Sequence, residues 1–264
     1  MIPLRPIRSI ATRELKRFFR QRGRFFAALA RPLLWLFIVG IGINRIVETP
    51  AGISYLQFLF PGIVGMVVLF SSIHSALSTV YDREFGVMRL ILVAPISRLT
   101  IVGGKVASGS LLSLLQAAVL LCLAPLIGIP LGVGQILLLT VCILLTAVAI
   151  TGVGLLLASR IDSLENFAGV MNFVVFPMFF LSGGLYPVKL LPDLLQWVIY
   201  ANPLAYGIDL FKHALLPGSP GTALGPDFSL ATNLAMLLAF STVTIAGATA
   251  LFDKEARLVR LATR

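Results

Sequence analysis

Residues 81–105 read YDREFGVMRLILVAPISRLTIVGGK, and long apolar stretches flank this short charged segment on both sides. The segment holds Asp82, Arg83, Glu84 and Arg89, followed by an apolar run over residues 90–93 and then by Pro95. A chain that turns back through a bilayer needs only a polar loop. This pattern instead predicts a short amphipathic helix that the proline ends. We expect that helix to lie at a membrane surface, where a partner protein can bind it.

The composition of the whole chain indicates an integral membrane protein. Of its 264 residues, 58% are hydrophobic and only 12% are charged, whereas a soluble domain is about one quarter charged. At about 20 residues per span, this length allows roughly six spans. The apolar runs are continuous and do not alternate with polar residues, which favours helices over a barrel. We therefore expect an all-α integral membrane protein, a single transmembrane domain over residues 1–264 with six transmembrane helices.

The expected spans cover residues 32–47, 56–80, 101–127, 135–159, 166–182 and 230–252. Before them, residues 1–31 are basic and interleaved with phenylalanines, which predicts an amphipathic interfacial helix over residues 7–30. Pro32 is expected to start the first span. A short polar loop is expected at residues 48–54, and a charged tail at residues 253–264. Residues 183–229 are too apolar for a solvated loop and are divided by prolines, which predicts short re-entrant helices in the outer leaflet.

The lysines and arginines are distributed unevenly between the two sides of the expected membrane. With the N-terminus inside, 18 of the 21 fall in inner segments and 3 in outer segments. This asymmetry predicts that both termini and the segment 81–100 are cytoplasmic, in a multi-pass protein of the inner or plasma membrane. We attribute the formal charge of +10 to contact with the lipid bilayer and predict no binding of nucleic acid.

The sequence lacks the motifs of several enzymes. The phosphate-binding pattern GxxxxGK[ST] is absent, since Lys105 is followed by Val106, so the chain should not hydrolyse ATP by a P-loop. No clustered Cys and His residues predict a metal site, and we expect neither catalytic residues nor a cofactor in this chain. The only ionisable side chain that we expect within the span interiors is His74. Its neighbouring serines favour a role in close helix packing, and a place in a transport pathway is the alternative.

Two parts of the sequence resemble the type-2 exporter permeases of the ATP-binding-cassette (ABC) transporters. The first comprises residues 83–86 (REFG), 92–98 (LVAPISR) and 104–105 (GK), which resemble the cytoplasmic coupling region of that family. The second comprises residues 176–187 (FPMFFLSGGLYP), 191–192 (LP) and 201–204 (ANPL) with Tyr206 and Asp209, which are similar to its fifth-span signature. The chain departs from the family at Leu90, where many relatives carry a glutamate after the basic residue.

The resemblance implies the membrane subunit of an ATP-driven exporter that moves a hydrophobic, amphipathic or lipid-linked substrate outward. Two copies would form a pore along their interface, and two separate ATPase subunits that bind ATP and Mg would dock on the coupling helix. The residues expected to couple to the ATPase are Arg83, Glu84, Phe85, Gly86, Met88, Arg89 and Leu92. Among them, Gly86 would allow a close approach of backbones.

Two further groups of residues are candidates for the path of the substrate. The candidate pathway follows the fifth span outward and comprises His74, Asn166, Asn172, Phe173, Phe176, Phe179 and Phe180. The candidate outer gate comprises Tyr186, Pro187, Asn202, Pro203 and Tyr206. Packing of the aromatic rings against other spans is the alternative for the first group. For the chain as a whole, the alternative is a secondary transporter or channel without an ATPase, and the substrate is not readable from the sequence.

Overall fold

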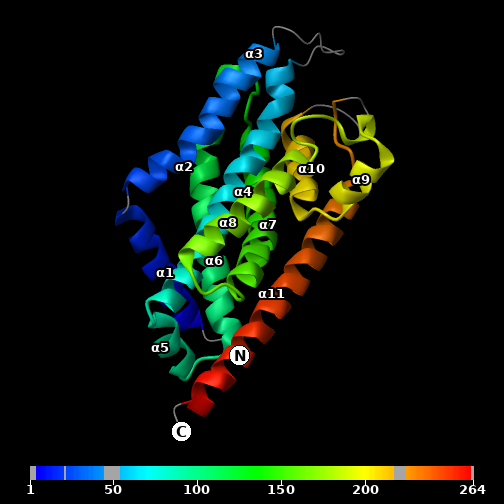
Figure 1. Ribbon diagram of the computed structural model, residues 1–264. Coiled ribbons are helices and arrows are strands. Elements are labelled where there is room, and N and C mark those ends of the chain that lie inside the picture. The colour runs from blue at the N-terminus through cyan, green and yellow to red at the C-terminus, as the bar shows by residue number, and fades with distance from the viewer. Residues whose placement is uncertain (1–3, 21, 45–53, 217–223, 263–264) are drawn as a thin grey trace.

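The computed structural model describes residues 4–20, 22–44, 54–216 and 224–262, and every regular element among them is a helix. The helices are α1 (Leu4–Arg20), α2 (Arg22–Leu34), η1 (Trp35–Gly40), α3 (Ile41–Asn44), α4 (Tyr55–Glu84), α5 (Val87–Val93), α6 (Arg98–Leu121), η3 (Ala124–Ile127), α7 (Val133–Ala158), α8 (Leu164–Phe180), η4 (Val188–Leu190), α9 (Asp193–Tyr200), α10 (Pro203–Leu215) and α11 (Leu230–Ala262). Figure 1 shows the long helices in a bundle, with α5, the start of α1 and the end of α11 at one end and α3, α9 and α10 toward the other.

The long helices confirm an all-α membrane protein. Within the described residues, α4, α6, α7 and the stretch Leu230–Ala256 of α11 are long and apolar enough to cross a membrane. Two shorter apolar helices, Ala28–Ile43 and Leu164–Phe180, lie where the first and fifth spans are expected. The expected third span is shorter than predicted. Its helix α6 ends at Leu121, and the 3-10 helix η3 follows after a turn.

Helix α4 forms the centre of the bundle. Of its most apolar 18-residue window, 89% is buried, compared with 22% for the corresponding window of α11. Helices α6, α7, α8 and α10 all pack against α4. A central helix has no face toward lipid, so it is apolar all round, whereas a peripheral helix buries only one stripe.

The first span does not begin at Pro32. This residue lies inside α2, and the helical backbone continues through the π-helical turn η1 to Asn44. Proline has no N–H to donate to the preceding turn, and local π-helical geometry is one way in which a helix accommodates such a gap. The predicted interfacial helix over residues 7–30 is likewise divided, since α1 ends at Arg20 and α2 begins at Arg22.

The charged residues of the opening segment belong to two helices. Asp82, Arg83 and Glu84 form the last turn of α4, so the predicted surface helix comprises only the seven residues of α5. The break is at Gly86, whose φ of 75° is left-handed, a conformation that glycine adopts without steric cost. Among the described residues, no heavy atom lies within 4 Å of a Cβ built there, so within this chain the glycine serves the turn.

Between α8 and α11 the described chain forms η4, α9 and α10, two of them very short, as the prolines predict. Helix α10 is buried against α4, α7 and α11 along most of its length. Parts of five predicted segments lie outside the described residues: 1–3 and 21 of the basic N-terminal segment, 45–47 of the first span, 48–53 of the polar loop, 217–223 of the outer segment, and 263–264 of the charged tail.

Candidate functional site

Helix α5 presents a mixed surface at the end of the bundle. Met88 and Leu92 are both 1% exposed and belong to the core of the bundle. Phe85, Leu90 and Val93 are 60%, 75% and 61% exposed. Residues four apart on a helix share a face, so the Met88–Leu92 face holds α5 against the bundle. Its opposite side is free to meet a partner.

Arg83 and Glu84 tie this end of α4 to three other helices. The guanidinium of Arg83 donates to the carbonyls of Ala158 and Ile161, at 2.6 and 2.7 Å, just at and beyond the end of α7. It also pairs with Glu255 of α11 at 2.8 Å. The carboxylate of Glu84 accepts from the backbone N–H of Leu164, the first residue of α8, at 2.7 Å. Cations suit a helix C-terminus and anions an N-terminus, so both charges match the helix ends that they hold.

Asp82, next to Arg83 in the sequence, belongs to a buried charge cluster that the sequence alone does not predict. Asp82 of α4 is 4% exposed and accepts from Lys105 of α6 and from Arg13 of α1, each at 2.8 Å. Lys105 is 1% exposed and lies 3.6 Å from Glu14. Burial alone lowers the pKa of Arg13, but its bonds to Glu14 and its attraction to Asp82 outweigh burial and raise that pKa. The cluster therefore fastens α1 to α4 and α6 rather than leaving α1 loose on a lipid surface.

One glycine lets α1 come this close to α6. A Cβ built at Gly104 would lie 2.9 Å from the Cβ of Ile10. That is closer than side-chain carbons approach, so a larger residue at this position would displace α1. Gly104 and Lys105 are adjacent in the sequence, and together they provide both the contact and the charge that attach α1.

The candidate pathway residues of α8 are divided between an exposed face and the bundle. Asn166, Asn172 and Phe173 are exposed, and Phe173 is the most exposed of the chain's large apolar residues described here, at 81%. Phe176 and Phe180 are about 40% exposed and stack on one another with ring centroids 6.5 Å apart. The structure therefore places these five residues on a surface of the monomer.

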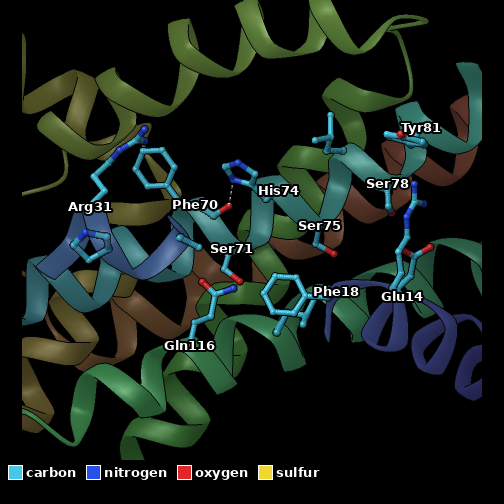
Figure 2. A pocket seen from close by; sticks show the side chains of 15 residues that line it. Glu14, Phe18, Arg31, Phe70, Ser71, His74, Ser75, Ser78, Tyr81 and Gln116 are labelled. Atoms are coloured by element: carbon cyan, nitrogen blue, oxygen red, sulfur yellow. Dashed lines mark hydrogen bonds between the residues drawn. The ribbon is translucent and has the colours of Figure 1, made fainter. Parts of the chain in front are cut away.

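Phe179 and His74 differ from the other members of the candidate pathway. Phe179 is 1% exposed, and its ring meets Trp35 edge to face at 6.0 Å, so it packs α8 against η1. The imidazole Nδ1 of His74 lies 2.8 Å from the carbonyl of Phe70, one turn earlier in α4. Figure 2 shows His74 on the wall of a cavity beside Phe70, while Phe70 also meets the ring of Phe176 at 6.4 Å.

The candidate gate residues form a hydrogen-bonded joint between α8 and α10. The amide of Asn202 donates to the carbonyls of Met178 and Leu181, at 2.7 and 2.6 Å, and its oxygen accepts from Leu204 N–H. Asn202 therefore caps α10 and also satisfies the end of α8. Of the remaining candidates, Pro203 is the first residue of α10, Tyr186 donates to the carbonyl of Phe180, Tyr206 donates to the carbonyl of Tyr200 at 2.7 Å, and Pro187 precedes η4.

A second buried polar network involves α10 and the start of α11. Of its members, only Asp209 belongs to the sequence motifs quoted above. Asp209 is 2% exposed and accepts from the N–H groups of Asp227 and Phe228 and from the amide of Asn233. Lys212, 1% exposed, pairs with Asp227 at 2.7 Å. Buried charges persist when they are paired and hydrogen-bonded. This network joins α10 to the start of α11.

Within the described residues no group of three or more His, Cys, Asp or Glu side chains is placed to hold a metal ion. The clusters described above consist of acid–base pairs that neutralise one another. Their arrangement suits mechanical attachment of helices.

Comparison with known proteins identifies the relatives of this chain. Residues 5–216 match the family model described as ABC-2 type transporter. The chain is 31% identical to the transport permease ycf38 of Cyanophora paradoxa over 76% of this chain and 73% of that protein. It is 28% identical to the inner membrane transport permease YadH of Escherichia coli (strain K12), over 89% of both chains. It is 30% identical to nodulation protein J of Rhizobium meliloti (strain 1021), over 75% of both.

Proposed function

Because the chain belongs to the ABC-2 type transporter family, we propose that it is the membrane permease of an ATP-driven exporter, working as a pair with separate ATPase subunits. The observation that carries this proposal is the geometry of α5. Its inner face is fixed by Met88 and Leu92, while Phe85, Leu90 and Val93 remain exposed beside Arg89. An exposed apolar cluster at the end of a membrane bundle suits a protein partner.

We propose a revised set of residues for this contact. Met88 and Leu92, expected to meet the ATPase, are buried within the chain and instead position α5. Arg83 and Glu84, also expected to meet it, bond to the ends of α7, α8 and α11. We assign Phe85, Leu90 and Val93 with Arg89 to the docking surface. In this scheme Arg83 and Glu84 transmit the displacement of α5 to the spans.

We further propose the arrangement of the chain in the inner membrane. The helix segment Ala28–Ile43 and α8 complete six spans with the four longer helices. Both termini and α5 would face the cytoplasm, which is consistent with their location at one end of the bundle in Figure 1. Helices α9 and α10 would then lie in the outer leaflet. There Leu194 and Trp197 of α9, 76% and 71% exposed, would contact lipid.

The substrate path is proposed along the exposed face of α8. Asn172, Phe173 and Phe176 line this face, and a second copy facing it would enclose a slot with aromatic walls and amide groups. Such a surface suits an amphipathic or lipid-linked molecule, whose apolar part contacts the rings and whose polar part meets the amides. ATP and Mg would be bound by the partner subunit, and export would proceed from the cytoplasm or the inner leaflet outward.

Docking is tested with two matched leucine variants. Leu90→Ser changes the exposed face of α5, while Leu126→Ser changes a leucine that is 79% exposed in η3, at a distance from α5 along the bundle. The partner ATPase subunit would be co-purified with each variant, and ATP hydrolysis measured. Truncation of a central interface residue costs more than 1 kcal/mol, so Leu90→Ser should weaken association by about tenfold. Equal retention of the ATPase by both variants would contradict the assignment.

Transmission is tested at Glu84. Glu84→Lys removes the acceptor for Leu164 N–H and places a cation at the N-terminus of α8, which the helix dipole disfavours. We expect ATP hydrolysis to continue while export in sealed vesicles falls, with membrane insertion intact. The control is Glu165→Lys. Glu165 is exposed in the first turn of α8 and follows Leu164 directly, so this variant makes the same charge reversal at that helix end but keeps the bond between Glu84 and Leu164 N–H. Unchanged export by Glu84→Lys would refute this role.

A further inference from the structure

A cavity of about 220 Å³ lies between α1 and α2 on one side and α4 and α6 on the other. Figure 2 shows that its wall carries serine hydroxyls, an amide and aromatic rings from helices far apart in the sequence. The carboxylate on this wall, Glu14, already accepts from Arg13 at 2.8 Å and lies 3.6 Å from Lys105. The acid is therefore neutralised by groups of the chain itself.

The cations on the same wall are less well matched. Arg17 lies over the ring of Tyr81 at 4.3 Å, and its nearest carboxylate oxygen, on Asp82, is 3.8 Å away. The guanidinium of Arg31 lies over the ring of Phe70 at 4.5 Å, and no ion pair joins it to a carboxylate among the described residues. Arginine presents a fork of donors that suits a phosphate. The Arg31 end of the cavity is therefore an electropositive site.

A buried hydroxyl on the wall of the same cavity also lacks a partner among the described residues. Ser71 is 4% exposed, and its Oγ makes no hydrogen bond within the described part of the chain. Leaving such a group unpaired costs free energy unless something else bonds to it. Ser71, Ser75 and Ser78 are four and three residues apart, so they form a row along α4, and Gln116 of α6, 2% exposed, lies opposite Ser71 in Figure 2.

The outer surface next to Arg31 is apolar. Leu34 and Ile38 lie three and seven residues further along the helical chain, and they are 56% and 66% exposed. Leu34 lies one turn after Arg31 on the same face of α2, and Ile38 lies in the π-helical turn that follows. Arg31 is also near the start of the apolar segment Ala28–Ile43, which is the depth at which lipid headgroups meet hydrocarbon.

These observations together describe a site for an amphiphile. We propose that the cavity binds an anionic phospholipid with a polyol headgroup. Its phosphate contacts Arg31, and the headgroup hydroxyls lie along the serine row, bonding to Ser71 and Gln116. The acyl chains lie outside the cavity on Leu34 and Ile38. The walls of this site come from a single copy of the chain, so the proposal does not depend on the exporter function or on an ATPase.

The test uses the purified full chain in detergent, titrated with phosphatidylglycerol, phosphatidylcholine and inorganic phosphate. Binding is followed by native mass spectrometry, and melting temperatures are measured without added lipid. Phosphatidylglycerol should bind more tightly than phosphatidylcholine. Arg31→Gln removes a charge-assisted contact and should weaken the binding of phosphatidylglycerol by about tenfold. Arg20→Gln is the control, since Arg20 is an exposed arginine of α1 outside this cavity.

Ser71→Ala separates ligand binding from structure. Because Ser71 Oγ has no partner in the described chain, the variant should keep its melting temperature without lipid and still bind phosphatidylglycerol more weakly. A fall in the lipid-free melting temperature would contradict this role of the hydroxyl. If Arg31→Gln and Arg20→Gln weaken lipid binding equally, the lipid responds to the overall positive charge of the surface, and the site at Arg31 is refuted. Occupation by inorganic phosphate at the same concentration, or no preference for phosphatidylglycerol, would overturn the lipid assignment.

Discussion

The charge cluster at Asp82 makes a strong prediction about stability. Asp82→Asn would leave Lys105, which is 1% exposed, with only Ser78 at 3.2 Å and Glu14 at 3.6 Å. Removing one partner of a buried ion pair costs about 3–5 kcal/mol. Because Lys105 keeps its contact with Glu14, we expect the free energy of unfolding to fall by about 3 kcal/mol. Lys105→Met should cost about half of that, since Asp82 keeps its bond to Arg13.

The double variant Asp82→Asn/Lys105→Met is the decisive one. It buries no unpaired cation, so its free energy of unfolding should fall by only about 2 kcal/mol. The coupling energy between the two positions should then be about 2 kcal/mol or more. Free energies of unfolding would be measured by reversible SDS titration in mixed micelles, followed by tryptophan fluorescence. The reasoning is refuted if the losses of the single variants simply add, or if Lys105→Met is the more damaging change.

Four further substitutions probe the joint at Asn202, the packing and the exposed face of α8, and the turn at Gly86. Asn202→Ala removes a helix cap and two further bonds, and a melting curve should show a loss of about 2–3 kcal/mol; an unchanged curve would contradict the joint. Phe179→Ala empties a buried site and should cost about 3–5 kcal/mol, whereas Phe176→Ala on the exposed face should lower transport more than expression, and equal loss of both would favour a packing role. Gly86→Ala places a side chain at positive φ, costing about 1–2 kcal/mol, and should reduce coupling in transport assays before it reduces the amount of folded protein.

The periodic apolar runs predict the long helices well because the bilayer demands them. The fourth expected span, residues 135–159, agrees within two residues with α7 at Val133–Ala158. The element boundaries differ from the prediction at a proline and at a glycine. Pro32 predicts a helix start, yet it lies inside α2 and the helical backbone continues into a π-helical turn. Gly86, at positive φ, separates α4 from α5 and so divides the charged segment between two helices.

The buried charge pairs could not be predicted because their partners are distant in the sequence. Arg13 and Asp82 are 69 residues apart, and Lys212 and Asp227 are 15 apart across an irregular segment. A count of basic residues assigns Lys105 to the cytoplasm and Lys212 to the outer side, as if both were free surface charges. Each is instead neutralised in the interior by an aspartate, although removing one lysine from each side leaves the asymmetry almost unchanged.

The seven residues of α5 show how a pattern can predict a helix without predicting which face is inward. Apolar residues occur on both sides of it, and only packing against the bundle distinguishes buried Met88 from exposed Leu90. The resemblance to the exporter family leads us to expect a glutamate at the position of Leu90, and the leucine found there is 75% exposed. We therefore expect the ATPase surface facing it to be apolar.

If that is correct, Leu90→Glu gives the chain its relatives' residue and yet weakens the complex. An ionised carboxylate would lose hydration in the interface without gaining a cationic partner, and each such mismatch costs several kcal/mol. The measurement is the dissociation constant of the permease for its own ATPase, with Leu90→Gln as a variant of similar size and no charge. Tighter association of Leu90→Glu would show a cation on the ATPase surface, and the contact would then be ionic rather than apolar.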